Sequence, residues 1–139
     1  MDYRIMAIDD EQDFLDSVNR GLITSGFKDV SLERDAQKAV SLFARGERVD
    51  LALIDVTMPG MSGIEVLEAI KCVSPNTECI MVTASNDARI AVDCLKKGAY
   101  DYLVKPVSRE DLVLSVNRAL ERRRLLDVLD LGKKKDVPR

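Results

Sequence analysis

The sequence predicts a single α/β domain in which helices cover both faces of one open, doubly wound, parallel sheet. Short apolar runs alternate with amphipathic stretches five times along the chain, as they do where helices join parallel strands. Continuous apolar runs are typical of strands that are buried on both faces. The length of 139 residues fits one such domain, which can bury a sufficient core without disulfides or a structural metal.

Five strands are predicted from the apolar runs, and the second is the weakest of them. Their ranges are Tyr3–Ile8, Val30–Glu33, Leu51–Ile54, Cys79–Val82 and Tyr102–Val104. Crossover connections between parallel strands of one sheet are right-handed almost without exception, so we expect that hand throughout.

Helix boundaries are predicted from capping and terminating residues. The first helix has an apolar face that includes Leu15, Val18 and Leu22. Residues suited to begin the later helices are Asp35, Gly63, Asn86 or Asp87, and Ser108. Residues suited to end the first four helices are Gly26, Gly46, Pro75 and Gly98.

Composition excludes several classes of site. The chain has no histidine, which removes His-dependent nucleophilic catalysis and His-ligated zinc. Its three cysteines, Cys72, Cys79 and Cys94, match neither a disulfide framework nor a zinc site, so we interpret them as small core residues. A net charge of −3 argues against direct nucleic-acid binding by this domain. Because no apolar run has the length of a membrane span and no signal peptide is found, the expected location is cytoplasmic, without membrane contact.

Polar residues follow four of the predicted strands. The first strand ends at Asp9 and Asp10, the third at Asp55, the fourth at Thr83 and the fifth at Lys105. The carboxyl ends of parallel strands lie along one edge of the sheet, where ligands bind in open α/β folds. We therefore expect these carboxylates, the hydroxyl and the ammonium group to lie together.

The expected group of carboxylates favours a metal site. Neighbouring carboxylates repel each other by about 4 kcal/mol per close pair near a protein surface. A divalent cation would relieve this repulsion, and oxygen ligands alone favour a hard ion such as Mg²⁺, which also binds phosphate oxygens. Lys105 and Thr83 would then contact a phosphoryl group. Asp55 is a candidate metal ligand, a candidate nucleophile, or both in turn.

Each of these residues also has a plainer interpretation. Taken alone, Asp10 would be the N-cap of the first helix, Thr83 a β-branched strand residue, and Lys105 a solvated strand end selected by Pro106. What favours a functional site is that all of them fall at the same end of the predicted strands.

Five sequence motifs resemble the receiver domain of two-component response regulators. They are DDE at 9–11, SGF at 25–27, LALIDVTMPGMSG at 51–63, MVTAS at 81–85 and KKGAYDYLVKP at 96–106. The resemblance covers residues 3 to about 121. It implies a (βα)5 flavodoxin-like fold with the strand order 2-1-3-4-5, and a receiver domain over residues 1–121.

The resemblance implies which residues accept the phosphoryl group and hold the metal. Asp55 is the expected phosphoacceptor, which takes its phosphoryl group from a phosphohistidine on a sensor histidine kinase or a histidine phosphotransfer protein. The expected Mg²⁺ ligands are Asp9, Asp10, Asp55 and the backbone carbonyl of Thr57.

The resemblance also implies a conformational switch. Lys105 and Thr83 match the phosphate-contacting lysine and the switch hydroxyl of the family. Tyr102 matches an aromatic residue that turns inward when the hydroxyl moves toward the phosphoryl group, and the bond before Pro106 matches a cis peptide. Such a domain catalyses only its own phosphorylation and dephosphorylation, so the chain is not expected to be an enzyme.

Residues 122–139 continue the helical pattern beyond the receiver. Apolar residues recur at Leu125, Leu126, Val128, Leu129 and Leu131, before a predicted stop at Gly132. We interpret this extension as a helical linker or short coiled coil toward an output domain that the chain lacks, and a self-contained end is the alternative. It resembles linkers to σ54-type ATPases or signalling enzymes more than linkers to winged-helix domains. The family also implies an output that regulates transcription or another partner, and phosphorylation-dependent homodimerisation.

Three other functions fit part of the pattern. Phosphatases of the haloacid dehalogenase type also use a strand-end Asp nucleophile and Mg²⁺, but they need a second Asp where this chain has Thr57. A flavodoxin-like cofactor binder would need a phosphate-binding loop after the first strand, and none is found. An interaction module that is never phosphorylated is disfavoured, because all five family positions are present.

Overall fold

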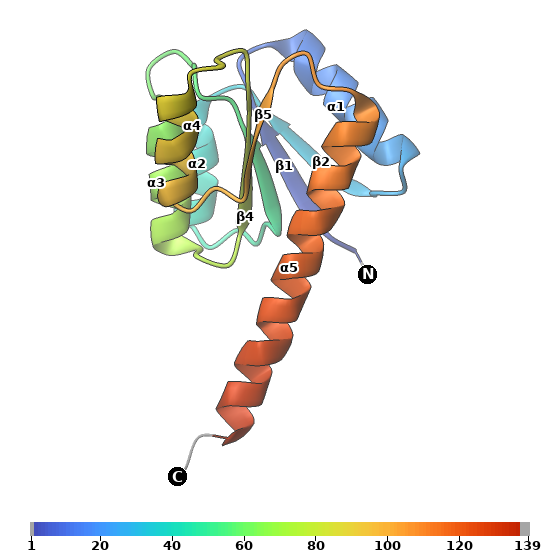
Figure 1. The fold of residues 1–139 in the computed structure, drawn as a ribbon, viewed down its shortest axis with the longest axis vertical. Helices are drawn as coiled ribbons and strands as arrows, with labels where there is room; N and C mark the ends of the chain where they lie inside the picture. Colours follow the sequence, from blue (N-terminus) through green and yellow to red (C-terminus); the bar gives the residue numbers. More distant parts are fainter. Residues whose placement is uncertain (1, 137–139) are drawn as a thin grey trace.

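The computed structural model describes the backbone of residues 2–136 and the side chains of residues 2–130. Its centre is a five-stranded parallel sheet with the order β2-β1-β3-β4-β5, which confirms the predicted topology (Figure 1). The strands are β1 (Arg4–Ile8), β2 (Asp29–Glu33), β3 (Leu51–Ile54), β4 (Glu78–Thr83) and β5 (Asp101–Val104).

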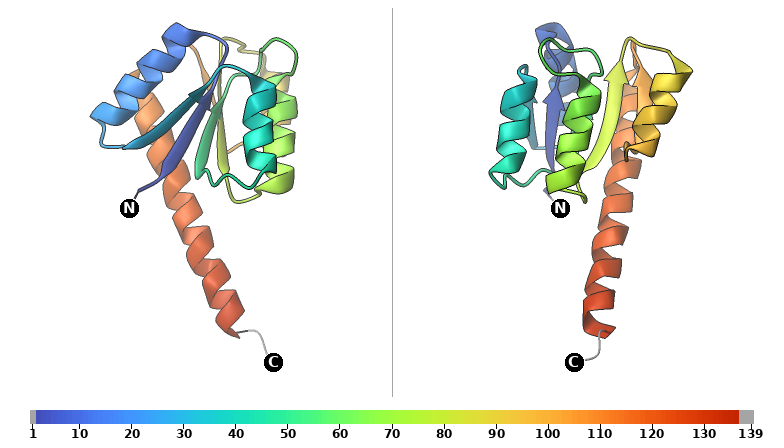
Figure 2. Two further views of the ribbon diagram at one scale, coloured as in Figure 1. Left: turned by 180° about the vertical axis from the view of Figure 1, so that it is seen from behind. Right: turned by 90° about the vertical axis from the view of Figure 1, so that its left-hand side faces the viewer.

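Five helices cover the two faces of the sheet. They are α1 (Gln12–Thr24), α2 (Ala36–Ala44), α3 (Gly63–Val73), α4 (Ala88–Lys96) and α5 (Arg109–Asp136). Helices α1 and α5 lie on one face, and α2, α3 and α4 lie on the other (Figures 1 and 2). The lower half of α5 continues past the sheet, so the last helix is extended as predicted.

The core consists of two apolar clusters, one on each face of the sheet. In β1, Ile5 and Ala7 belong to the cluster with α1 and α5, whereas Met6 and Ile8 belong to the cluster with α2 and α3. Successive side chains of a strand point to opposite faces, so a strand between two helical layers must be apolar at every position. This explains the continuous apolar runs of the sequence.

Most of the predicted helix starts are confirmed by capping hydrogen bonds. The side chains of Asp35, Asp87 and Ser108 each accept a backbone N–H in the first turns of α2, α4 and α5 respectively. Helix α3 begins at Gly63 as predicted, and Ser62 caps it through a reciprocal capping box.

Two predictions about helix boundaries are wrong. The plainer interpretation of Asp10 as the N-cap of α1 fails, because Glu11 occupies that position and makes no side-chain cap. Gly132 does not end α5, whose backbone stays helical to Asp136. A glycine inside a helix costs only about 1 kcal/mol relative to alanine, so it permits a stop without requiring one.

Strand pairing also moves some strand ends. Strand β1 begins at Arg4, and β4 extends by one residue at each end, to Glu78 and Thr83. Glu78 lies opposite Leu51 of β3, so the pairing of β3 with β4 begins at a charged residue that precedes the apolar run.

The helices differ in how firmly they are packed. Helix α3 buries Gly63, Val66, Leu67 and Ile70. By contrast, Cys94 is the only buried residue of the nine in α4, all of which the structure describes. Within residues 2–136, none of the helices combines the length and apolar character needed to cross a bilayer.

Thiol reactivity provides a test of this packing. Cys72 is exposed, whereas Cys79 and Cys94 are buried, and all three are free. Burial raises the pKa of the Cys79 thiol to about 12 and also raises that of Cys94, so both stay protonated at neutral pH. We expect Ellman's reagent to modify Cys72 rapidly in the native protein and the other two only after denaturation. Equal rates for all three thiols in the native protein would contradict this packing.

Candidate functional site

The predicted polar residues meet at the carboxyl edge of the sheet, around a cleft of about 310 Å³. They come from the ends of β1, β3, β4 and β5, as the parallel topology requires. The residues that line the cleft are Asp10, Glu11, Asp55, Thr57, Thr83, Ala84 and Lys105. Asp9 lies just beneath it, almost fully buried and hydrogen-bonded to Lys105.

Lys105 carries the positive charge of the site. Its Nζ lies 2.8 Å from Asp9 Oδ2, 3.1 Å from Glu11 Oε1 and 3.7 Å from Asp55 Oδ2. The same Nζ lies 4.1 Å from the centroid of the Phe14 ring. Burial lowers the pKa of Lys105, but hydrogen bonds to the carboxylates outweigh it, so the pKa is raised and the group stays charged.

Asp9 anchors the cleft from beneath. Its Oδ1 accepts the backbone N–H of Glu11 at 2.9 Å. Burial raises the pKa of Asp9 and the nearby charge of Asp55 adds to the rise, while hydrogen bonds from Lys105 and from the Glu11 backbone oppose it. One lysine thus faces three carboxylates, and this excess of negative charge favours a second cation at the same place.

A group of three carboxylates has the spacing of a metal site. Oxygen atoms of Asp9, Glu11 and Asp55 all lie within 4.8 Å of one another. The prediction named Asp10 where this group has Glu11. Asp10 lines the cleft, and its backbone carbonyl accepts two hydrogen bonds from the Arg34 guanidinium, at 3.0 and 3.2 Å. Sequence reasoning missed the side chain of Glu11, although it stands directly after the acidic pair in the DDE motif.

The loop after β3 holds Asp55 in place. Its Oδ1 accepts the backbone N–H of Thr57 at 3.3 Å, and the Asp55 N–H donates to Ile8 of β1 at 3.1 Å. Gly63 then returns to this loop, where its N–H donates to the carbonyl of Val56 at 2.7 Å. A Cβ atom at Gly63 would lie 1.9 Å from the Asp55 carbonyl oxygen, so only glycine fits. Sequence reasoning assigned Gly63 to the helix start and missed this close approach.

The two predicted switch residues are linked through Ser85. The backbone N–H of Ser85 donates to Thr83 Oγ1 at 3.4 Å, and its carbonyl accepts the Tyr102 hydroxyl at 2.8 Å. Thr83 is buried, and Tyr102 is partly buried against the cluster with α2 and α3. The Lys105–Pro106 peptide bond is cis, as the resemblance implied. Movement of the Thr83 side chain would therefore act on a residue that also holds Tyr102.

Comparison with known proteins identifies the family. The family model described as response regulator receiver domain matches residues 5–117. This chain belongs to the response regulator receiver domain family. Receivers of two-component systems are signalling switches, and the alternatives of a phosphatase or an unrelated binding module are not favoured.

Two curated relatives contain a segment similar to this receiver. A cyclic di-GMP phosphodiesterase from Thermotoga maritima is 39% identical over 119 residues, which are 86% of this chain and 31% of that protein. The C4-dicarboxylate transport transcriptional regulatory protein DctD from Rhizobium meliloti is 32% identical over 122 residues, 88% of this chain and 26% of that protein. The receiver thus spans only a quarter to a third of the length of these two relatives.

Solved structures show the same fold for isolated receivers. The response regulator receiver domain from Methanospirillum hungatei JF-1 is 31% identical and superposes with a TM-score of 0.83. The match covers 89% of this chain and 98% of that one.

Proposed function

We propose that this receiver is a phosphorylation switch in which Asp55 accepts a phosphoryl group from a phosphohistidine of a sensor histidine kinase or a histidine phosphotransfer protein. The observation that carries the proposal is the position of the Asp55 carboxylate, which lines the cleft 3.7 Å from Lys105 Nζ. A nucleophile beside a fixed cation and in reach of solvent suits phosphoryl transfer, in which positioning and charge compensation supply most of the catalysis.

We assign the metal ligands to Asp9, Asp10, Asp55 and the backbone carbonyl of Thr57, with Mg²⁺ as the ion. The donor set fits this ion, because it consists of oxygens alone. Two of its carboxylates, those of Asp9 and Asp55, lie with the Glu11 carboxylate within 4.8 Å of one another. When bound, Mg²⁺ would supply positive charge beside the phosphoryl oxygens. Lys105 donates hydrogen bonds to both Asp9 and Glu11. The Glu11 carboxylate is therefore a further candidate ligand for the same ion.

In the proposed step, a carboxylate oxygen of Asp55 forms a bond to phosphorus as the P–N bond of the phosphohistidine breaks. The electron pair of that bond returns to the imidazole, and the product on this chain is an acyl phosphate. Lys105 donates a charge-assisted hydrogen bond to one phosphoryl oxygen, and the Thr83 hydroxyl donates to another. Attack by water on phosphorus later breaks the bond to the Asp55 oxygen, which releases inorganic phosphate and restores the carboxylate.

Intact-mass spectrometry after incubation with acetyl phosphate tests this function. We expect a gain of one phosphoryl group that requires Mg²⁺ and does not occur when EDTA is present from the start. No gain, with steady release of phosphate from small phosphoesters, would make the chain a phosphatase. No gain and no turnover would make it an interaction module.

Lys105→Ala is expected to slow phosphorylation and to uncouple it from the switch. The lost charge-assisted hydrogen bond is worth about 1.5–3 kcal/mol, so uptake from acetyl phosphate should slow roughly ten- to hundredfold. In the wild type, we expect phosphorylation to shift the backbone amide NMR signals of Ser85 and Tyr102. In phosphorylated Lys105→Ala, these signals should stay near their positions in the unphosphorylated protein. A shift in phosphorylated Lys105→Ala equal to that of the wild type would contradict the coupling role.

The domain context is also part of the proposal. We take residues 1–121 as the receiver and residues 122–139 as a helical extension toward an output domain, in line with the partial coverage of the relatives. The output would regulate transcription or another partner, with phosphorylation-dependent homodimerisation as a further step. The three free thiols suit a cytoplasmic location, where disulfides are rare.

A further inference from the structure

Two buried carboxylates lie at the edge of the sheet opposite the phosphoryl cleft. Asp50 immediately precedes β3, and Glu78 is the first residue of β4. Both residues are almost fully buried, at 3% and 2% exposed. A buried carboxylate is costly unless it is paired, so the partners of these two groups indicate what this edge does.

Asp50 is paired with the extension beyond the receiver. Its Oδ2 accepts the backbone N–H of Arg4 at 2.8 Å, and its Oδ1 lies 3.1 Å from Arg123 Nε. Arg123 Nη1 donates to the backbone carbonyl of Asn76 at 2.6 Å, so one guanidinium bridges the segments before β3 and β4. Arg48 approaches the same carboxylate more loosely, at 3.8 Å. The Arg123 side chain is only 11% exposed.

Glu78 is paired with the preceding arginine. Its Oε1 lies 3.5 Å from Arg122 Nη1, and the Arg122 guanidinium lies 5.8 Å from the centroid of the Tyr100 ring. Its Oε2 is buried without a hydrogen-bond partner, the sole side-chain oxygen or nitrogen in that condition within the part of the chain that the structure describes. Burial raises the pKa of Glu78, and the charge of Arg122 opposes the rise.

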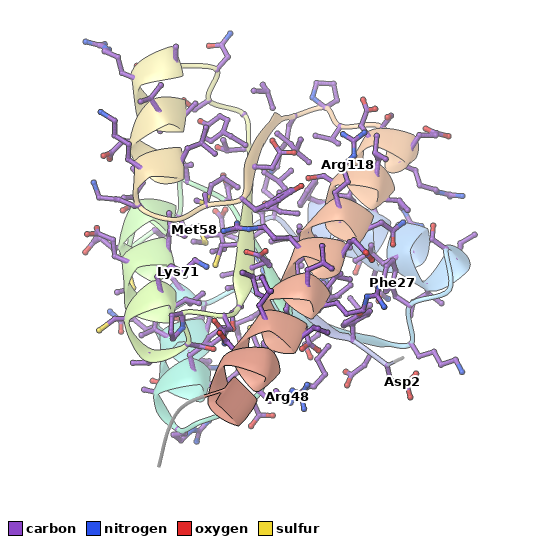
Figure 3. The ribbon with its side chains drawn as sticks, turned by 60° about the horizontal axis from the view of Figure 1, so that its bottom comes forward. Asp2, Phe27, Arg48, Met58, Lys71 and Arg118 are labelled. Atoms are coloured by element: carbon purple, nitrogen blue, oxygen red, sulfur yellow. The ribbon has the colours of Figure 1, made fainter. Side chains whose placement is uncertain are left out.

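The third consecutive arginine, Arg124, has a different partner. Arg124 pairs with Glu121 of its own helix, at 3.0 Å, and half of its side chain is exposed. Figure 3, in which the bottom of the molecule comes forward, shows α5 running from Arg118 toward the side of the molecule where Arg48 is labelled. Arg122 and Arg123 thus pair with carboxylates at the sheet edge, whereas Arg124 forms its ion pair within α5.

We infer that Asp50 and Glu78 form a docking site for Arg122 and Arg123, and that this acidic socket fixes the direction in which α5 leaves the receiver. The extension is then an integral part of the domain as far as residue 123, and not a flexible tether that begins at residue 122. Its attachment points are the segments that lead into β3 and β4, the strands whose other ends carry Asp55 and Thr83.

Time-resolved fluorescence anisotropy tests this attachment. The chain contains no tryptophan, so Leu125→Trp, at a position that is 52% exposed, places a single indole just beyond the socket. In this background, Arg123→Met removes the guanidinium and keeps the apolar stem. Arg124→Met makes the same chemical change at an arginine that pairs with Glu121 and not with the socket, and is the matched control.

We expect the control to tumble with the domain, and Arg123→Met to gain a fast nanosecond component with at least twice the amplitude seen in the control. Equal decays in the two variants would overturn the proposal. If Arg123→Met loses its cooperative thermal transition because Asp50 has lost its closest cation, the double variant Asp50→Asn/Arg123→Met removes both charges and takes its place. A folded double variant without the fast component would likewise overturn the proposal. Phosphoryl uptake should stay at the wild-type level in both arginine variants, because neither residue lines the cleft.

Discussion

Asp55→Asn is expected to take up no phosphoryl group from acetyl phosphate, at any Mg²⁺ concentration, while its fold stays intact. The amide has nearly the shape of the carboxylate but is neutral and a very poor nucleophile, so the bond to phosphorus cannot form. The hydrogen bond from the Thr57 N–H, now 3.3 Å from Asp55 Oδ1, can be kept by the amide oxygen. Intact-mass spectrometry and a thermal unfolding curve would measure the two effects.

Asp9→Asn is the matched control for this variant. It removes one carboxylate from the same cluster and leaves the proposed nucleophile in place. Phosphoryl uptake should then need a higher Mg²⁺ concentration than in the wild type, and it should recover when that concentration is raised. Uptake by Asp55→Asn at the wild-type rate would exclude Asp55 as the acceptor, and an Asp9→Asn variant with unchanged Mg²⁺ dependence would exclude Asp9 as a ligand.

Gly63→Ala is expected to destabilise the receiver by at least about 3 kcal/mol, the upper range for inserting a methyl group into a packed site. The new Cβ would meet the Asp55 carbonyl oxygen at 1.9 Å and the Val56 Cα at 2.7 Å. Both atoms are backbone, so no side-chain rotation relieves the clash. A loss of this size is a large fraction of the 5–15 kcal/mol that typically stabilises a domain. Urea unfolding would measure it.

Gly60→Ala separates this contact from backbone conformation. Gly60 has a φ of +80°, which strains an alanine by about 1–2 kcal/mol, but nothing lies within 4 Å of its added Cβ. Gly63 does not have a positive φ, so Gly63→Ala tests only the contact of the added Cβ with the backbone. A Gly63→Ala variant no less stable than Gly60→Ala would show that the loop after β3 moves aside easily. In that case, the slower phosphorylation expected from a displaced Asp55 should also be absent.

The sequence was sufficient to predict the sheet and the edge where the site lies, because both follow from local patterns. Apolar runs of strand length predict buried strands, and parallel strands bring their carboxyl ends together whatever the side chains are. Asp55, Thr83 and Lys105 therefore fall into one cleft as expected. The wrong predictions, such as the helix stop at Gly132, concern positions where a residue permits a conformation without requiring it.

The contacts that were missed depend on distances between segments far apart in the sequence. Glu11 joins the carboxylate group through a hydrogen bond from Lys105, which follows the last strand and is 94 residues away in the sequence. Ser85 links the predicted switch residues through its backbone N–H and carbonyl. Because any residue has these groups, the residue type does not predict the link. In the sequence, Arg123 cannot be told from its two neighbouring arginines. In the structure, it pairs with the buried Asp50. No periodicity in the sequence encodes such pairings.

The shallow packing of α4 makes it the least costly of the five helices to move. Cys94 is its only buried residue, while Val92 and Leu95 remain about half exposed. Segments with few buried contacts open at a free energy far below that of global unfolding. A complete shift between two conformations needs about 5.5 kcal/mol of differential interaction, and a few charge-assisted hydrogen bonds supply energy of that order. In the proposed switch, such energy would be available to bias the position of α4, because few buried contacts hold this helix in place.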